Sequence, residues 1–243
     1  MVFGLFSSKE KNLKKTIERA TNKLSQQPDR WGALEALKRD GSDEALAGLC
    51  KRWSVTSQKA VEDEQEKHWV VDVLVANGPA SLGPLVTYMK TADTLSFALR
   101  VLERIADHDK VLEVADQLFA SEQPGYVRMP DRRIDLLRWF SEWKGATDDE
   151  LIGRLTPYVT DFDENSRYAA IDGMAERAPE KIAPPLIAAL IRPEEESGRI
   201  KRRIAEVLAK SKAPLGDQAP AVAAMFSGPL SDFRVDGGVV KQR

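Results

Sequence analysis

Apolar residues recur at intervals of three and four along most of the 243-residue chain, and polar residues fill the positions between them. This spacing gathers the apolar side chains on one face of an α-helix. Nothing alternates with the period of two that a strand requires, apart from the short stretch "FRVDGGVVKQR" near the C-terminus. The pattern predicts an all-α fold. The apolar faces that carry it are Leu34 with Leu37; Val70, Val73 and Leu74; Ala98, Val101, Leu102 and Ile105; Ile134, Leu137 and Phe140; Ala170, Ile171 and Met174; and Ile204, Val207 and Leu208.

The predicted helices come in pairs. A shorter helix such as "ASLGPLVTYMK" is followed by a polar turn and a second helix such as "TLSFALRVLERIAD". One pair with such a period cannot bury its apolar face alone and must stack on the next pair. We therefore expect a right-handed α–α superhelix, an α-solenoid, of about six helix pairs. Equivalent apolar positions on the second helices recur every 28 to 37 residues, at Leu37, Leu74, Leu102, Leu137, Met174 and Leu208.

Two proline-containing segments one hundred residues apart resemble each other, and we interpret them as junctions between repeats. In "LVANGPASLGPLVTYM" and "MAERAPEKIAPPLIAAL", Pro79 corresponds to Pro179 and Pro84 to Pro184. Proline suits the start of a helix because the first turn leaves its N–H groups unpaired in any case. The expected domains are an N-terminal amphipathic or capping helix over 1–24, the solenoid over 25–228, and a flexible C-terminal tail over 229–243.

Residues 160–210 resemble HEAT repeats and their bacterial HEAT-like relatives. In "TDFDENSRYAAIDGMAERA" the family's turn Asp and the Arg six residues later are Asp161 and Arg167. In "RPEEESGRIKRRIAEVLAK" the corresponding positions are Glu196 and Arg202. The resemblance implies a HEAT/armadillo-like solenoid in which the acidic and basic side chains help to register neighbouring repeats. We expect Asp161 and Arg167 to interact, directly or through the turn.

Composition and motifs give no indication of catalysis or of a cofactor. The formal net charge is −2, which disfavours a protein that coats phosphate backbones. The single cysteine, Cys50, is expected to be a buried thiol, and the two histidines, His68 and His108, cannot form a multi-histidine metal site. No Walker A, GxSxG, HExxH or dinucleotide-binding motif occurs. No apolar run approaches the roughly 20 residues that span a bilayer, so a cytoplasmic location is expected.

One segment matches four ligand positions of a calcium-binding EF-hand loop. Asp161, Asp163, Asn165 and Asp172 occupy the first, third, fifth and twelfth places, but Ser166 stands where that loop requires glycine. The residues after Asn165 also have the pattern expected for the first turns of a helix. We favour helix capping over a metal site here.

The stretch "YVRMPDRRIDLLRWFSEWKG" gathers arginines and tryptophans, which are typical anchors of protein interfaces. The preferred hypothesis is a non-catalytic scaffold or adaptor that presents a concave helical surface to a protein partner. The two tryptophans could instead fill the core of an irregular repeat. A second hypothesis is a nucleic-acid-binding protein similar to the HEAT-like alkylpurine DNA glycosylases. The candidate partner-binding residues are Arg100, Arg104, Arg132, Arg133, Trp139, Trp143, Arg202 and Arg203.

The N-terminal segment combines apolar and basic residues. Leu13, Ile17 and Leu24 give it an apolar side. Such a helix can cap the open end of a solenoid, or it can lie on an anionic membrane surface at the cytoplasmic side. The residues expected to make weak membrane contact are Phe3, Leu5 and Phe6, followed by Lys9, Lys11, Lys14, Lys15 and Lys23.

Overall fold

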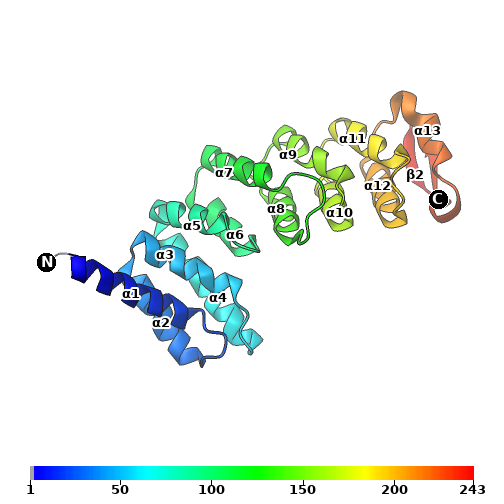
Figure 1. Ribbon diagram of the computed structural model, residues 1–243. Helices are drawn as coiled ribbons and strands as arrows, with labels where there is room; N and C mark the ends of the chain where they lie inside the picture. Colours follow the sequence, from blue (N-terminus) through cyan, green and yellow to red (C-terminus); the bar gives the residue numbers. More distant parts are fainter. Residues whose placement is uncertain (1–2) are drawn as a thin grey trace. The chain divides into compact units, whose positions relative to one another are not determined.

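The structure of the protein, a computed structural model, describes residues 3–243, with side chains from residue 8 onward (Figure 1). In these residues the chain forms thirteen α-helices, five short 3-10 helices and one two-stranded sheet. The predicted all-α class is confirmed. The chain divides into two compact units, unit 1 (Met1–Asp116) and unit 2 (Gln117–Arg243), each of which is described by itself. No helix in the described residues is long and apolar enough to cross a membrane.

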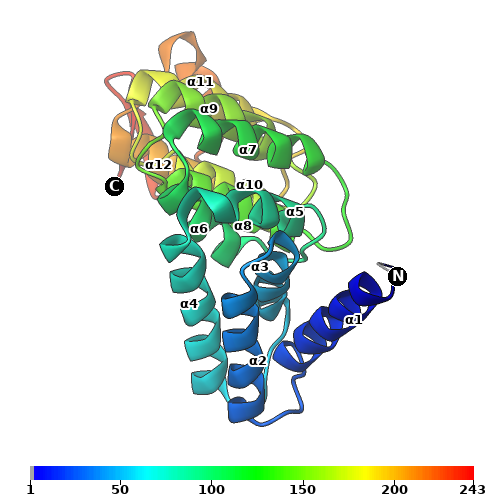
Figure 2. The ribbon, with the colours of Figure 1, turned by 90° about the vertical axis from the view of Figure 1, so that its left-hand side faces the viewer.

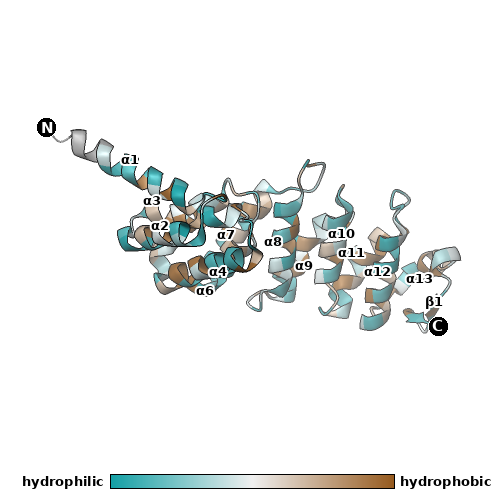
Figure 3. Cartoon of the chain, turned by 90° about the horizontal axis from the view of Figure 1, so that it is seen from below, coloured by the Kyte–Doolittle hydropathy of each residue, from teal (hydrophilic) through white to brown (hydrophobic). Residues whose placement is uncertain are grey.

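Unit 1 is built from two layers of helices. Helices α1, α3 and α5 pack in succession in one layer, and α2, α4 and α6 pack in the other (Figures 1 and 2). Figure 3 shows hydrophobic and hydrophilic positions on different sides of the helices, as the periodicity predicted. The elements are α1 (Phe3–Ala20), α2 (Gln27–Asp40), α3 (Asp43–Cys50), η1 (Lys51–Ser54), α4 (Ala60–Ala76), η2 (Gly78–Ser81), α5 (Leu82–Met89), α6 (Ser96–Ile105) and the first part of α7 (His108–Ser121).

Helix α1 packs against α2 and α3. A glycine makes the contact with α3 close, because a Cβ at Gly48 would lie 2.6 Å from the Ile17 side chain. Ala20 is buried and Ile17 is half-buried, whereas Leu24 lies beyond the helix and is 74% exposed. The lysines at 9, 11, 14 and 15 point to solvent. The side chains of Phe3, Leu5 and Phe6, for which membrane contact was predicted, lie outside the described residues.

Five charged side chains are buried together where α2, η1 and α4 meet. Glu66 accepts hydrogen bonds from Arg30 Nε over 3.0 Å and from Arg52 Nε over 2.6 Å. Asp63 accepts from Arg52 Nη2 over 2.6 Å and pairs with Lys67 Nζ over 2.7 Å. A buried charge is tolerated when it is paired and hydrogen-bonded, and here each one is. This charged network therefore connects α2, η1 and α4 of unit 1.

Unit 2 repeats the two-layer arrangement. Helices α8, α10 and α12 pack in one layer and α9, α11 and α13 in the other (Figure 1). Gly173 allows α10 to pack closely against α8, because a Cβ at this position would lie 2.0 Å from Ser141 Oγ. The elements that follow α7 are α8 (Asp131–Glu142), α9 (Asp148–Leu155), η3 (Thr156–Thr160), α10 (Glu164–Gly173), α11 (Pro179–Ile191), α12 (Gly198–Ser211), η4 (Gly216–Gln218), α13 (Ala219–Ala224), η5 (Gly228–Leu230), β1 (Phe233–Asp236) and β2 (Val239–Gln242).

The segment predicted as a flexible tail over 229–243 is instead largely a β-hairpin. Strand β1 pairs antiparallel with β2, and the turn consists of Gly237 and Gly238, whose φ angles of 62° and 75° glycine adopts without strain. Phe233 is fully buried and Val240 is 1% exposed, because β1 packs against α13 and β2 packs against α12. The alternation noted in the sequence, with its Gly-Gly turn, was therefore a real strand indication.

Successive helices of the α8–α10–α12 layer are linked by arginines that reach the turn before the next helix. Arg133 of α8 binds the carboxylate of Asp161, and Arg167 of α10 lies 2.9 Å from that of Glu195. In both turns the acid also accepts the backbone N–H two residues further on, that of the N-cap residue. The third arginine, Arg202, binds the Asp232 carboxylate over 2.6 Å. The acid–arginine contacts thus recur at each step along this layer.

The expected interaction between Arg167 and Asp161 is present, because Arg167 donates to the backbone carbonyl of Asp161 over 2.8 Å. The Asp161 carboxylate itself binds Arg133. Glu196, predicted as the second turn acid, is exposed, and Glu195 occupies that role at 4% exposure. The acid that pairs with an arginine is the one two residues before the N-cap residue. Its spacing from the arginine in the sequence does not identify it.

Candidate functional site

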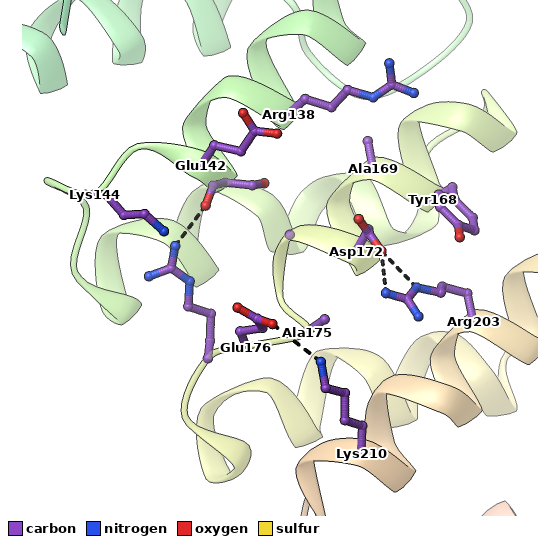
Figure 4. Close-up of a pocket in the computed structure, with 13 residues that line it drawn as sticks. Arg138, Glu142, Lys144, Tyr168, Ala169, Asp172, Ala175, Glu176, Arg203 and Lys210 are labelled. Carbon is purple, nitrogen blue, oxygen red and sulfur yellow. Dashed lines mark hydrogen bonds and ion pairs between the residues drawn. The ribbon is translucent and has the colours of Figure 1, made fainter. Parts of the chain in front are cut away.

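A groove with a volume of about 470 Å³ runs along the α8–α10–α12 layer of unit 2 (Figure 4). Small residues form its floor: Ala169 and Gly173 of α10, and Ala175 in the turn that follows α10. Long polar side chains from α8, α10, α12 and the turns after α8 and α10 form the walls. The charged residues that line it are Arg138, Glu142, Lys144, Asp172, Glu176, Arg177, Arg203 and Lys210.

Helical spacing brings these side chains to one face. Arg138 and Glu142 are four residues apart on α8, and Tyr168 and Asp172 have the same spacing on α10. Residues four apart lie above one another on a helix, so each pair points the same way. The opposite faces carry the core, for example Leu137, which is fully buried. The groove is therefore the solvent face of three helices whose other faces hold unit 2 together.

Ion pairs fix part of the groove wall. Arg203 donates from Nε to Asp172 Oδ1 over 2.9 Å, and Lys210 Nζ lies 3.4 Å from Glu176 Oε1 (Figure 4). Partial burial acts to lower the pKa of Arg203, but the hydrogen bond and charge of Asp172 outweigh it, so that pKa is raised. Arg203 thus remains a cation under all ordinary conditions.

The remaining cations are placed differently. Arg177 donates from Nη2 to the backbone carbonyl of Ser141 over 2.9 Å and lies 3.5 Å from Asp148. Arg138 and Lys144 form no ion pair with any residue that the structure describes. Five basic and three acidic side chains line the groove, a net charge of +2 in a chain whose total is −2.

One aromatic side chain stands at the groove. The guanidinium of Arg199 lies 4.1 Å from the centre of the Tyr168 ring, and that of Arg203 lies 6.0 Å from it. Cation–π contacts of this kind hold an aromatic ring in place. Tyrosine held in this way offers a flat apolar surface and a hydroxyl to a binding partner.

The aromatic residues predicted to bind a partner lie inside unit 2. Trp139 is 7% exposed and Trp143 is 9% exposed, and their rings stack with centres 6.0 Å apart. Arg133 is 1% exposed, and its guanidinium donates hydrogen bonds to Asp161 and to three backbone carbonyls. The alternative interpretation, that the tryptophans fill the core of an irregular repeat, agrees with these positions.

The other predicted residues are scattered. Arg203 lines the groove, Arg132 pairs with Glu122 over 2.8 Å, and Arg202 is engaged with the hairpin. Arg100 and Arg104 are exposed on α6 of unit 1. Of the eight residues, one therefore belongs to the groove.

Sequence reasoning missed most of the groove, although a usable indication was present. Arg138, Tyr168 and Asp172 occupy the polar positions between the apolar ones of the second helices. The cluster richest in aromatic residues is largely buried, whereas the exposed face of a helix is indicated by its polar positions.

The described residues contain no group of three or more histidine, cysteine or acidic side chains placed to hold a metal ion. The EF-hand-like residues have structural partners instead: Asp163 caps α10 by accepting from Ser166 N over 2.8 Å, and Asp172 binds Arg203. Cys50 is fully buried, and burial raises the pKa of its thiol to about 12, so it remains protonated.

Comparison with known proteins adds no relative: the chain matches no protein-family model, no curated protein and no solved structure.

Proposed function

We propose that the chain is a non-catalytic adaptor of the HEAT-like type, acting in the cytoplasm, which holds a segment of a partner protein in the α8–α10–α12 groove. The proposal includes the right-handed superhelix of about six helix pairs that such repeats form. Its architectural support is the acid–arginine contact that recurs along one layer of unit 2, with Arg133 and Asp161 separated by 28 residues and Arg167 and Glu195 by the same number.

The observation that carries the proposal is the groove itself. Its walls are charged and hydrogen-bonding side chains from α8, α10, α12 and the turns after α8 and α10, with Tyr168 held among them. Tyrosine and arginine are enriched at protein interfaces, where they supply contact area and directional hydrogen bonds. An extended peptide has backbone N–H and C=O groups along its length that such walls can satisfy.

Affinity capture from the native cell extract tests this proposal when groove variants are compared. The bait is the full chain, and captured proteins are quantified by mass spectrometry. Tyr168→Ala and Arg138→Glu should each reduce capture of a specific protein about tenfold, the effect of one interface anchor. Lys59→Ala, an exposed change on unit 1, serves as the control. Equal capture by all variants with unchanged melting temperatures would remove the groove from the proposal.

Nucleic-acid binding is the second candidate, and the observation in its favour is the excess of basic side chains in the groove. Against it, Arg203 and Lys210 already pair with acids, and Trp139 and Trp143 are buried. Fluorescence anisotropy with duplex DNA between 50 and 200 mM salt distinguishes the two, because phosphate contacts weaken steeply over this range. We expect no salt-dependent binding and no release of alkylated bases.

A further inference from the structure

The segment between α7 and α8 lacks regular structure, yet buried side chains fix its backbone. Arg133 donates from Nη2 to Gln123 O over 2.6 Å and from Nη1 to Gly125 O over 2.9 Å. Its Nε donates to Glu122 O over 3.2 Å, and the Tyr158 hydroxyl donates to the same carbonyl over 3.0 Å. Four hydrogen bonds from buried side chains thus hold three backbone carbonyls of this connection in place.

The same arginine joins this segment to the turn before α10. Arg133 Nη1 lies 2.8 and 3.0 Å from the two carboxylate oxygens of Asp161. Asp161 in turn accepts from the backbone N–H groups of Gly125, over 3.3 Å, and Asp163, over 2.7 Å. The two segments therefore form one rigid frame, although 36 residues separate Gly125 from Asp161.

This frame presents large apolar side chains to solvent. Tyr126 is 74% exposed, Phe162 is 68% exposed, and their rings meet edge to face with centres 5.4 Å apart. Met129, on the same connection, is 69% exposed. Tyr126 and Phe162 are named here the aromatic patch. With Met129 they are three of the five large hydrophobic side chains exposed in the part of the chain that the structure describes. Rigid exposed aromatic groups are what binding anchors consist of, because little entropy is lost when a partner covers them.

An acidic groove of about 410 Å³ begins next to the patch, at the N-terminal ends of α10 and α12. Arg167 connects the two, since it donates to Phe162 O over 3.1 Å and pairs with Glu195 in the groove. Glu196 is exposed and forms no ion pair with another described residue. Four glutamates and two arginines give the lining a net charge of −2; these residues are Glu164, Arg167, Arg192, Glu194, Glu195 and Glu196.

We propose that the aromatic patch and the acidic groove together bind a basic-apolar peptide segment of a partner protein. An apolar side chain of that segment packs against Tyr126 and Phe162, and lysine or arginine residues beside it lie opposite Glu194 and Glu196. Charge complementarity selects this class and rejects acidic segments, for which the groove lining is repulsive. The surface shares no residue with the α8–α10–α12 groove, whose net charge has the opposite sign.

A random dodecapeptide library displayed on phage tests the proposal without assuming a sequence. The full chain is the target, and the double variant Tyr126→Ala/Phe162→Ala is used for counter-selection. Both side chains are exposed, so the double variant should fold, which circular dichroism and the melting temperature will check. The enriched peptides are expected to carry an aromatic or aliphatic residue within a few positions of two or more basic residues. Absence of enrichment, or enrichment of acidic sequences, overturns the proposal.

Fluorescence anisotropy with the most enriched peptide then locates the site. Phe162→Ala should weaken binding at least tenfold, as expected for a central anchor. Glu196→Lys, a surface change, should weaken it several-fold and reduce the dependence on salt. Arg138→Glu in the other groove is the matched control and should leave affinity unchanged. If Arg138→Glu weakens binding while Phe162→Ala does not, the peptide occupies the α8–α10–α12 groove and the proposed surface is wrong.

Discussion

Unit 1 and unit 2 both bury charged side chains between helices, but they distribute them differently. In unit 1, Arg30, Arg52, Asp63, Glu66 and Lys67 share one site, and each carboxylate accepts from two cations. In unit 2 the contacts are spaced along the α8–α10–α12 layer, one for each helix junction. In a shared network, removal of one side chain weakens the hydrogen bonds of the others. In separate pairs, removal of one side chain affects only its own pair. The two units should therefore differ in how far a single substitution spreads.

The largest effect is expected from Arg52→Ala. Arg52 is fully buried and binds Glu66, Asp63 and the Val55 carbonyl, so its loss leaves several groups short of a partner. Removal of one partner from a buried ion pair costs about 3–5 kcal/mol, and we expect about 4 here. Urea unfolding followed by circular dichroism measures the loss, and hydrogen exchange should rise throughout α2 and α4.

The control for this substitution is Lys59→Ala, because the Lys59 side chain is 76% exposed in its pair with Glu62. It should change stability little, as exposed ion pairs do. Equal losses for the two variants, or exchange that rises at η1 alone, would show that the charges of unit 1 do not act as one network.

The next largest effect is expected from Asp161→Asn in unit 2. The substitution keeps the size of the side chain but removes the charge that faces the buried Arg133, at a cost of about 3 kcal/mol. The frame that holds the connection to α8 should loosen, and trypsin should cleave faster after the exposed Arg128. Cleavage is followed by mass spectrometry of the fragments.

Asp149→Asn provides the matched control, since Asp149 pairs with Lys181 at the surface. This variant should be cleaved after Arg128 at the wild-type rate. Rates that rise equally in both variants would mean that the Arg133–Asp161 pair does not restrain the connection.

The same comparison explains which parts of the molecule the sequence could predict. The helices were predictable because an apolar face such as Leu137 with Phe140 must be buried whatever its neighbours are. The partner of Arg133 was not predictable from spacing, because it lies 28 residues away across a helix junction. The turn acids could have been found by counting back two residues from the caps at Asp163 and Ser197, which gives Asp161 and Glu195.

The burial of Trp139 and Trp143 results from packing between helices, which the apolar periodicity of the sequence does not show. A helix covered on one side buries a narrow stripe, and Ile134, Leu137 and Phe140 fit such a stripe. Helix α8 instead buries a wide arc that includes Trp139, while Ile134 is half-buried. The arc widens because α8 packs against α9 and α10, and neighbours of this kind are fixed only in the folded unit.

Acid should act on unit 1 through Asp63. Burial acts to raise the pKa of this carboxyl, but hydrogen bonds from Lys67, the Ser57 N–H and Arg52 outweigh it and hold the pKa well below its usual range. Because the pKa is lower in the folded state, ionised Asp63 stabilises the fold, and this contribution is complete at pH values above the unfolded-state pKa, about 3.9 for aspartate. That contribution decreases as the pH falls from about 4 toward the folded value, by up to about 1.4 kcal/mol per pH unit.

Urea midpoints of unit 1 at pH 5, 4 and 3, followed by hydrogen exchange in α4, measure this dependence. Asp63→Asn should be less stable at pH 5 and should lose less on going to pH 3 than the wild-type chain does. A parallel decline of the two proteins would assign the acid sensitivity to other carboxylates.

The smallest effect is expected from Arg167→Ala, at about 1 kcal/mol, the usual net worth of a hydrogen bond. Arg167 donates to the carbonyls of Asp161 and Phe162 and pairs with Glu195, but its side chain is 14% exposed and lines an open groove. When the side chain is removed, water can enter and hydrate the Glu195 carboxylate, which keeps its hydrogen bond from Ser197 N over 2.9 Å. No such route exists for Asp161, which is buried on all sides.

Thermal unfolding of Arg167→Ala beside Asp161→Asn therefore measures how much burial, rather than the pairing itself, determines the strength of these contacts. A loss near 3 kcal/mol for Arg167→Ala would make the two contacts equivalent, and the spacing of the pairs along the layer would then matter more than their exposure.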